Sequence, residues 1–363
     1  MSFRISRPSV PLLCAMALMA LPATHADAAR HAKRRLPVAS GHAADVVTYG
    51  RRDDVMRFAA AVAQSTQLDL AWVEAALAKA RYQPAVARLI MPPAVGIAKN
   101  WKAYRARFVE PQRIRAGVDF WLANQAWLEA AEREYGVPPE IVVGIIGVET
   151  IFGRMTGEFR VLDALATLSF DFPTGRKDRS AFFRDELTQF LVLAHREQQA
   201  PEGIKGSYAG AIGLGQFMPS SIVKHAVDFN NDGRIDMARN SADVIGSVAH
   251  YLAEFGWKKG MPTHFAVQPP VDTSERAALL VPDIVPSFSA AQLAERGAVL
   301  ADDGQGHEGL LALVELQNGD AAPSHVAGTQ NFYVVTRYNW SAYYALAVIE
   351  LGQAIKAARQ PRS

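Results

Sequence analysis

The spacing of apolar residues divides the chain into two helical blocks and a later region of short strands. In residues 52–136 and 138–257, apolar positions recur at steps of three and four, which is the period of an α-helix. Asp69 and Asp119 lie where helices of the first block could begin, because aspartate is a preferred capping residue. We therefore expect a helical domain at 52–136 and a helical core at 137–262.

The pattern changes after the core. Short runs rich in β-branched and aromatic residues are separated by proline, glycine and aspartate, which is typical of a small antiparallel sheet. These runs lie at 265–271, 279–282, 311–316 and 332–336. A helix predicted at 340–358 belongs to a final segment, 336–363, that we expect to return to the core. The predicted fold class is mainly α (α+β), with a small antiparallel β domain at 263–335.

The first 28 residues have the features of a secretory signal peptide. Arg4 and Arg7 precede an apolar stretch at 10–22, and small residues follow at 23–29. The stretch is shorter than the roughly 20 residues that a membrane-spanning helix needs. Cys14, the only cysteine, lies inside it without the small residues expected before a lipidated cysteine, so a lipoprotein is the weaker alternative. We expect an exported, soluble protein with no transmembrane anchor.

Charge and composition indicate neither a nucleic-acid partner nor a zinc site. The stretch at 29–51 is polar and basic, and we expect a flexible linker there, with contact to an anionic cell surface as the weaker alternative. The net charge of +2 is too small to indicate a nucleic-acid partner. The nine histidines form no HExxH pair and no Cys/His cluster, so the sequence predicts no zinc site.

A glutamate at the end of an apolar helix is the main candidate for chemistry. Pro138 and Pro139 suit the first turn of a helix, and residues 141–148 carry no polar side chain, so this helix should be buried. Glu149 follows directly, and Gly153 is the expected terminator. Burial should raise the pKa of Glu149, as a general acid working near neutral pH requires.

The same helix allows a purely structural reading of its glutamate. Glu149 could be satisfied by Arg154, by Arg160 or by backbone amides, because buried carboxylates usually have partners. The helix alone leaves the two readings about equally supported.

Longer motifs favour the catalytic reading. They are Gly-Val-Glu-Thr at 147–150 with Gly-Arg at 153–154, Leu-Asp-Ala-Leu-Ala-Thr-Leu-Ser-Phe at 162–170, a glycine-rich segment ending Gly-Gln-Phe-Met-Pro-Ser-Ser at 206–221, and Asn-Phe-Tyr-Val-Val-Thr-Arg-Tyr-Asn at 331–339. In this order, the segments resemble the lytic murein transglycosylase B family (membrane-bound lytic transglycosylase B-like, glycoside hydrolase family 103). The resemblance covers about residues 52–358 and implies a lysozyme-like core and a soluble periplasmic enzyme of cell-wall turnover and remodelling.

The resemblance implies that Glu149 cuts the β-1,4 bond between N-acetylmuramic acid (MurNAc) and N-acetylglucosamine. Glu149 would act first as an acid and then as a base, and the product would end in a 1,6-anhydro ring. Ordinary glycosidases use two carboxylates. No convincing second one is found, since Asp163 lies in a helical pattern and Asp171 and Asp178 lie in a predicted loop.

The resemblance also implies a set of glycan-binding residues. Phe217 and Met218 alone would be read as core residues, and Arg179 is a weaker candidate for contact with the peptide stem. The expected partners are peptidoglycan glycan strands, with cell-wall synthases as a further candidate, and we expect a monomer. The implied substrate-binding residues are Ser207, Gln216, Phe217, Met218, Asn339, Tyr338, Tyr344, Tyr104, Tyr251 and Arg179.

The segment at 228–236 is similar to the start of an EF-hand loop. Oxygen-bearing side chains alternate around a glycine at the sixth place, but Arg239 occupies the twelfth place, where an EF-hand has glutamate. Relatives with longer loops imply Asp243 as the closing ligand. The alternative is an Asx-rich turn without an ion. We expect no cofactor for catalysis and a structural Ca²⁺ held by Asp228, Asn230, Asp232, the Arg234 carbonyl and Asp243.

Two other functions remain open from sequence. A lysozyme-type hydrolase would require a second carboxylate that holds a water. A non-catalytic peptidoglycan-binding or scaffold protein is the other alternative, and the presence of Glu149, Ser207, Gln216 and Asn339 counts against it.

Overall fold

The computed structural model describes residues 48–50, 52–92 and 98–359, and it is mainly helical. The predicted signal peptide and almost all of the predicted linker lie outside these ranges. Within them, no helix is long and apolar enough to cross a membrane. The first elements are α1 (Asp53–Thr66), α2 (Leu70–Ala78), α3 (Pro84–Leu89), α4 (Trp101–Ala106), α5 (Pro111–Ala123), α6 (Gln125–Tyr135), α7 (Pro139–Thr150), β1 (Phe159–Arg160), α8 (Val161–Phe170), α9 (Ser180–Arg196) and β2 (Lys205–Gly206). The later elements are α10 (Pro219–His225), α11 (Ser241–Glu254), β3 (His264–Gln268), α12 (Thr273–Leu280), α13 (Ala290–Glu295), β4 (Val299–Leu300), α14 (Asp302–Gln305), β5 (Ala312–Asn318), β6 (Ala321–Gly328), α15 (Gln330–Tyr338) and α16 (Ala342–Arg359).

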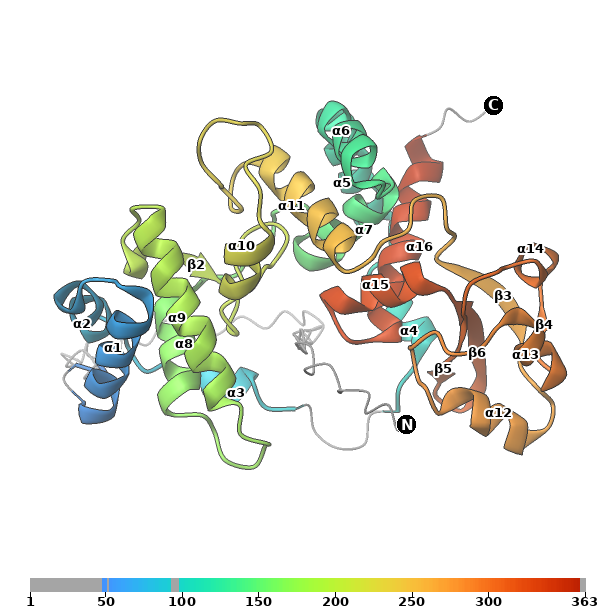
Figure 1. The fold of residues 1–363 in the computed structure, drawn as a ribbon, viewed down its shortest axis with the longest axis horizontal. Coiled ribbons are helices and arrows are strands. Elements are labelled where there is room, and N and C mark those ends of the chain that lie inside the picture. Colours follow the sequence, from blue (N-terminus) through green and yellow to red (C-terminus); the bar gives the residue numbers. More distant parts are fainter. Residues whose placement is uncertain (1–47, 51, 93–97, 360–363) are drawn as a thin grey trace, which may run out of the picture.

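The N-terminal helices lie in two places. In Figure 1, α1 and α2 lie beside α8 and α9 at one end of the molecule, and α5 and α6 lie near α7. Asp69 caps α2, because its carboxylate accepts from the Trp72 amide at 2.8 Å. The prediction for Asp119 was wrong. It lies inside α5, which Glu110 caps by accepting from the amides of the first turn.

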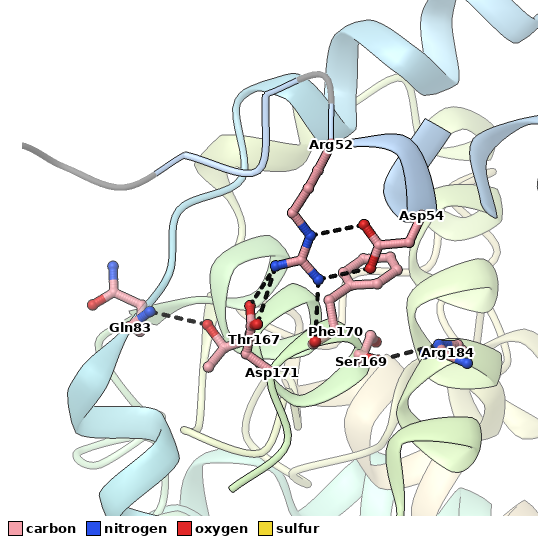
Figure 2. Close-up of polar contacts among 8 residues, drawn as sticks. All are labelled: Arg52, Asp54, Gln83, Thr167, Ser169, Phe170, Asp171 and Arg184. Atoms are coloured by element: carbon pink, nitrogen blue, oxygen red, sulfur yellow. Dashed lines mark hydrogen bonds and ion pairs between the residues drawn. The ribbon is translucent and has the colours of Figure 1, made fainter. Parts of the chain in front are cut away.

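Arg52 anchors the start of α1 to the end of α8, as Figure 2 shows. Its guanidinium contacts both oxygens of Asp171 at 3.0 Å and both oxygens of Asp54 at 2.7 and 2.8 Å. It also donates to the Phe170 carbonyl at 3.1 Å. Each exposed ion pair contributes little alone, but paired contacts in one network fix the geometry. Asp171 is therefore a structural residue.

The core is built around α7, which packs along α16. Every residue of α7 except Glu140 is buried. A Cβ added at Gly144 would lie 2.3 Å from the Val348 carbonyl oxygen, and one added at Gly352 would lie 2.0 Å from that of Glu140. These glycines permit a backbone approach that any larger residue would block. The two helices are thus held unusually close together.

The β region is a four-stranded antiparallel sheet in the order β4-β3-β6-β5. It lies at the opposite end of the molecule from α1 and α2 (Figure 1) and has a small core of its own, including Phe265, Leu293 and Leu313. The predicted sheet is confirmed: the run at 265–271 begins in β3, which ends at Gln268, and the run at 311–316 largely coincides with β5. The runs at 279–282 and 332–336 are not strands.

Capping and packing explain the two wrong strand predictions. Residues 279–280 end α12, whose first turn Asp272 caps by accepting from two backbone amides. Residues 332–336 lie inside α15, which Thr329 caps. Phe332 and Val335, one turn apart, are both fully buried. A cap and an apolar helical face outweigh the modest strand preference of β-branched residues.

Candidate active site

Glu149 lies in the last turn of α7. The helix ends at Thr150, earlier than the terminator predicted at Gly153, because Ile151 and Phe152 already have left-handed φ angles of 51° and 57°. Left-handed φ is unusual for any residue with a side chain and rare for a β-branched one. The Thr150 hydroxyl donates to the Leu214 carbonyl at 2.8 Å and so ties the end of α7 to the glycine-rich segment.

The phenol of Tyr344, on α16, donates a hydrogen bond to Glu149 Oε1 at 2.6 Å. Glu149 is only 8% exposed. Burial raises its pKa to about 7, and the hydrogen bond from Tyr344 opposes this rise because it favours the ionised form. Near neutral pH the carboxyl can therefore give up a proton and take one back.

Neither of the two arginines that could have paired with a purely structural Glu149 does so among the described ion pairs. Arg160 faces Asp163, with 3.5 Å between Nε and Oδ2, and Arg154 is exposed. Asp163 also accepts from the Arg81 amide at 3.0 Å. Among the described hydrogen bonds, the one to the Glu149 carboxylate comes from a phenol.

A cavity of about 300 Å³ opens beside Glu149. Its walls come from α9, α10, α11 and α15 and from the segment that precedes α10. Of the predicted site residues, it brings together Glu149, Gln216, Phe217, Met218, Tyr251 and Tyr338. The residues that the sequence analysis did not single out are Phe182, Glu186, Ser220, Ser221, Lys224, His225, Phe255 and Arg337.

Aromatic rings form one side of this cavity. The Tyr338 ring lies 5.6 Å from that of Phe217 and 5.2 Å from that of Tyr251, and it stacks with Tyr344 at 6.4 Å. The Tyr338 hydroxyl donates to the Gly215 carbonyl, and the Tyr251 hydroxyl donates to that of Arg337 at 2.8 Å. Because these phenols are tied to the backbone, the rings form a fixed wall.

Gln216 and Met218 join the glycine-rich segment to the cavity. The Gln216 side-chain amide donates to the carbonyls of Thr156 at 3.0 Å and Gly213 at 2.8 Å, which leaves its oxygen to accept a further hydrogen bond. Its φ of 51° is left-handed, so a constrained turn holds the side chain in place. Met218 precedes the first residue of α10 and is buried.

The other predicted residues lie outside the wall of the cavity. The Ser207 hydroxyl oxygen accepts from the Ala211 amide at 3.0 Å, and Asn339 is buried just after α15. Tyr344 is only 2% exposed, so in this conformation it orients Glu149 and does not close over the cavity. Burial, and after it the charge of Glu149, raise the pKa of Tyr104 to about 12. Arg179 lies 4.7 Å from the ring of Phe182, which lines the cavity.

Glu186 is a cavity carboxylate that the sequence analysis missed. It is 3% exposed, and its two oxygens accept from the Ser220 amide at 2.9 Å and the Ser220 hydroxyl at 2.6 Å. Burial raises its pKa, which the two hydrogen bonds oppose. Its sequence signal was a single acid on an apolar helical face, three residues after Phe183 and four before Phe190. Glu186 ties α9 to the first turn of α10.

Comparison with known proteins identifies the family. Residues 50–353 match the family described as the Transglycosylase SLT domain. The chain is 43% identical over 270 residues to membrane-bound lytic murein transglycosylase B of Escherichia coli (strain K12), which covers 74% of this chain and 71% of that protein. The chain belongs to the lytic murein transglycosylases. It is therefore an enzyme of peptidoglycan, as its motifs predicted.

Solved lytic transglycosylases share the fold. Slt35 of Escherichia coli in complex with calcium is 39% identical, with a TM-score of 0.74 over 85% of this chain and 94% of that one. SltB3 of Pseudomonas aeruginosa in complex with NAG-anhNAM-pentapeptide is 26% identical, with a TM-score of 0.70 over 83% of this chain and 79% of that one. The predicted mainly α, lysozyme-like fold with small antiparallel sheets is confirmed.

The acidic loop, residues 228–236, and Asp243 of α11 are linked to each other by hydrogen bonds. Asp228 accepts from the Asp232 and Gly233 amides at 3.1 and 2.7 Å, Asn230 binds Asp232 at 2.9 Å, and Asp232 accepts from the Arg234 amide at 3.0 Å. Buried Asp243 accepts from the amides of Phe229 and Asp236. Across residues 48–50, 52–92 and 98–359, no group of three or more His, Cys, Asp or Glu side chains is placed to hold a metal ion. The side chains predicted as ligands are therefore engaged in hydrogen bonds within this segment.

Proposed function

We propose that this lytic transglycosylase cleaves the MurNAc-β-1,4-GlcNAc bond with Glu149 as its only acid and base, and that its product ends in 1,6-anhydroMurNAc. The main support is the environment of Glu149. Its carboxyl lines the cavity, accepts a hydrogen bond from the Tyr344 phenol and has a pKa raised to about 7. A carboxyl with such a pKa is populated in both protonation states at neutral pH.

The proposed steps return Glu149 to its starting state. The protonated carboxyl gives its proton to the glycosidic oxygen, and the bond from that oxygen to C1 of MurNAc breaks. The ionised carboxylate then takes the proton of the MurNAc 6-hydroxyl as O6 bonds to C1. No water is consumed. The attacking hydroxyl belongs to the same sugar, and an internal nucleophile has a high effective concentration, which offsets the missing second carboxylate.

The cavity wall supports the glycan-binding roles expected from the family. Phe217, Tyr251 and Tyr338 offer fixed apolar faces against which sugar rings can pack, and Met218 lines the same cavity. The free oxygen of Gln216 can accept from a sugar hydroxyl or acetamido group.

The remaining roles are those that the resemblance implies. Ser207 is proposed to hydrogen-bond the muramoyl sugar, Asn339 to close over the glycan and Tyr104 to line the cleft. Arg179 is the weaker candidate for contact with the peptide stem.

Product analysis tests this function. Purified peptidoglycan would be digested with the wild type, with Glu149→Gln and with Glu186→Gln, and the products weighed by mass spectrometry. We expect anhydro-ended products from the wild type and from Glu186→Gln, and none from Glu149→Gln. Reducing ends, heavier by one water and lost in Glu186→Gln, would instead show a hydrolase with two carboxylates. If none of the three proteins released products, the chain would only bind glycan.

One feature of the cavity weighs against the hydrolase. Glu186 is the carboxylate that could hold an attacking water, but both of its oxygens accept from Ser220. The raised pKa of Glu149 disfavours the non-catalytic alternative. A buried carboxyl of this kind lowers the stability of the fold, and a protein that only binds glycan would not need it.

We propose that the acidic loop binds a structural Ca²⁺ when the ion is present. Asp228, Asn230, Asp232, the Arg234 carbonyl and Asp243 are hard oxygen donors, the kind that calcium prefers, and the relative Slt35 was solved in complex with calcium. Addition of Ca²⁺ to metal-free protein should raise Tm, and the rise should be lost in Asp232→Asn. Asp272→Asn, in a helix cap, is the matched control. An unchanged Tm in the wild type would leave the loop as an Asx-rich turn.

We propose export to the periplasm, with cell-wall turnover and remodelling as the role. The charged head, apolar stretch and small residues at 1–28 support a signal peptide. The mass of the protein recovered from a periplasmic extract should correspond to cleavage near Ala26 or Ala28. The full-length mass in that extract would contradict this assignment.

A further inference from the structure

Glu186 is a buried carboxylate of the cavity that the proposed reaction does not use. It lies on α9, is 3% exposed and lines the same cavity as Glu149. One of its oxygens accepts from the Ser220 hydroxyl at 2.6 Å, and the other accepts from the Ser220 amide at 2.9 Å. Ser220 is the second residue of α10, which lies beside α9 in Figure 1. Both oxygens of Glu186 are therefore engaged with the first turn of α10.

The first turn of α10 needs this acceptor because its own cap residue does not supply one. Amides in the first turn of a helix have no partner within the helix, and a polar side chain at the cap position normally accepts from them. Here the cap residue is Met218, whose side chain makes no cap hydrogen bond and lines the cavity. Glu186 supplies the acceptor from a neighbouring helix, which leaves the cap position to an apolar residue of the cavity wall.

The segment that precedes α10 connects this contact to the acid. Residues 212–217 form a tight turn, closed by two backbone hydrogen bonds of 2.8 and 3.1 Å between its end residues. The Leu214 carbonyl of this turn accepts from the hydroxyl of Thr150, which follows Glu149 in the chain. The other end of the turn runs into the first turn of α10, where Glu186 holds it. The cavity wall is thus fastened at two points, one next to the acid and one at Glu186.

We propose that Glu186 is a positioning residue of the reaction, whose ionised carboxylate holds residues 212–218 of the cavity wall in place beside Glu149, and that its protonation makes the enzyme lose activity in acid. This inference rests on the proposed function, in which Glu149 must be protonated to begin the reaction. Glu149 alone then limits activity only at high pH, so a loss at low pH requires a second group. Protonation turns one Glu186 oxygen into a donor, which competes with the two donors of Ser220.

The surroundings of Glu186 set where it titrates. Burial raises its pKa above the ordinary value of 4.5, the hydrogen bonds from Ser220 and the charge of Lys224 oppose the rise, and the charge of Asp185 adds to it. The loss of activity in acid should therefore begin above pH 4.5. The other carboxyl, imidazole and cationic groups on the neighbouring parts of α9, on α8, α10 and η1 (Pro201–Gly203), and in the cavity are Arg184, Asp163, His225, Glu202, Glu149 and Arg337.

The pH dependence of kcat tests this inference. Wild type, Glu186→Gln, Glu186→Asp and Ser220→Ala are assayed on soluble peptidoglycan fragments across the pH range, with products weighed by mass spectrometry and the fold followed by circular dichroism. Glu110→Gln is the matched control. The Glu110 carboxylate also accepts from two amides in the first turn of a helix, α5, but Glu110 is not among the described residues that line the cavity.

The wild-type profile should fall on both sides of neutral pH. Glu186→Gln resembles the protonated acid at every pH, so its kcat at neutral pH should be about tenfold lower and should not fall further as the pH is lowered to about 5. Its alkaline limb and its anhydro products should be retained. Ser220→Ala should move the acid limb to higher pH, because it removes a hydrogen bond that favours the ionised form. Glu186→Asp should keep an acid limb, and Glu110→Gln should keep the wild-type profile.

An acid limb that persists unchanged in Glu186→Gln would assign the loss of activity to another group and overturn the inference, as would wild-type kcat in this variant at neutral pH. If Glu186→Gln did not fold, an unmoved acid limb in Ser220→Ala would still contradict it. Reducing-end products from the wild type that are lost in Glu186→Gln would instead overturn the proposed function. The two failures are distinguishable, because the mass of the products is read independently of the pH profile.

Discussion

Tyr344 acts on Glu149 in the direction opposite to burial. Its phenol stabilises the ionised carboxylate, whereas burial favours the protonated form. Tyr344→Phe removes the hydrogen bond and keeps the ring, so the pKa of Glu149 should rise above about 7. The acid form should then persist to higher pH. The alkaline limb of the pH profile of kcat should move upward, while kcat at neutral pH falls because the carboxyl is less well oriented.

A neighbouring tyrosine provides the control. The Tyr343 hydroxyl contacts the backbone of Gln317, and its ring packs on Tyr104, a contact that phenylalanine would keep. Tyr343→Phe should leave the pH profile unchanged. A Tyr344→Phe enzyme whose alkaline limb did not move would show that the phenol does not set the pKa of Glu149.

Individual residues of the site differed in how well the sequence revealed them. Glu149 stood out because it directly follows the apolar run of a helix, whereas Gln216 was found only through the resemblance of its motif to the family. Glu186 and Arg337 gave only local signals, an acid on an apolar face and a cation in a helix end. Their place in one cavity depends on how α9 and α15 meet, which periodicity does not encode.

Among the elements, the pair of α7 and α16 sets the geometry of the acid. Gly144→Ala would place a methyl group 2.3 Å from the Val348 carbonyl oxygen, and a helix backbone cannot yield locally. The helices should separate, at a cost of about 1–3 kcal/mol in the free energy of unfolding. Since α16 carries Tyr344, kcat should also fall, by about tenfold or more if the carboxyl moves by an ångström.

Denaturant unfolding and steady-state kinetics check this prediction. Gly306→Ala is the control, since an added Cβ at Gly306 meets nothing within 4 Å and the backbone there is not left-handed. Wild-type stability and kcat in Gly144→Ala would mean that the two helices can move apart without disturbing the acid.

Element types were predictable where one signal dominated. Long apolar periodicity gave the helical blocks, and alternating short runs with turn residues gave the sheet. The errors at 279–282 and 332–336 arose where β-branched residues lie inside capped helices, because tertiary burial outweighs their intrinsic preference. The end of α7 was misplaced because Ile151 takes a left-handed conformation that its side chain disfavours. Strain of this kind is held by the surrounding fold and is invisible in sequence.

For the whole molecule, the raised pKa of Glu149 should lower the free energy of unfolding at high pH. The pKa of Glu149 rises from 4.5 to about 7 on folding, so the native state binds more protons than the unfolded state between these values. Stability should therefore fall as pH rises through this window and level off above it. The loss amounts to about 3 kcal/mol, from roughly 1.4 kcal/mol per pKa unit.

Glu149→Gln should remove this dependence. Relative to the wild type, the variant should gain stability between pH 4 and pH 8, measured as the free energy of unfolding at each pH. Asp54→Asn should lose stability relative to the wild type, because Arg52 lowers the pKa of Asp54 from 3.8 to about 2. The stability that the Asp54 carboxylate contributes is present above pH 3.8 and is lost as the pH falls toward about 2. A difference between Glu149→Gln and wild type that did not vary with pH would contradict the raised pKa.

The contact between Tyr344 and Glu149 joins residues 195 positions apart. The chain is made from its N-terminus, so the acid is synthesised well before the helix that supplies its partner. A nascent or truncated chain that ends before α16 has the acid without its phenol and leaves uncovered the face of α7 that packs on α16. Activity against the wall would then arise only after the final helix has docked, which separates the time of synthesis and export from the time at which the enzyme can cut.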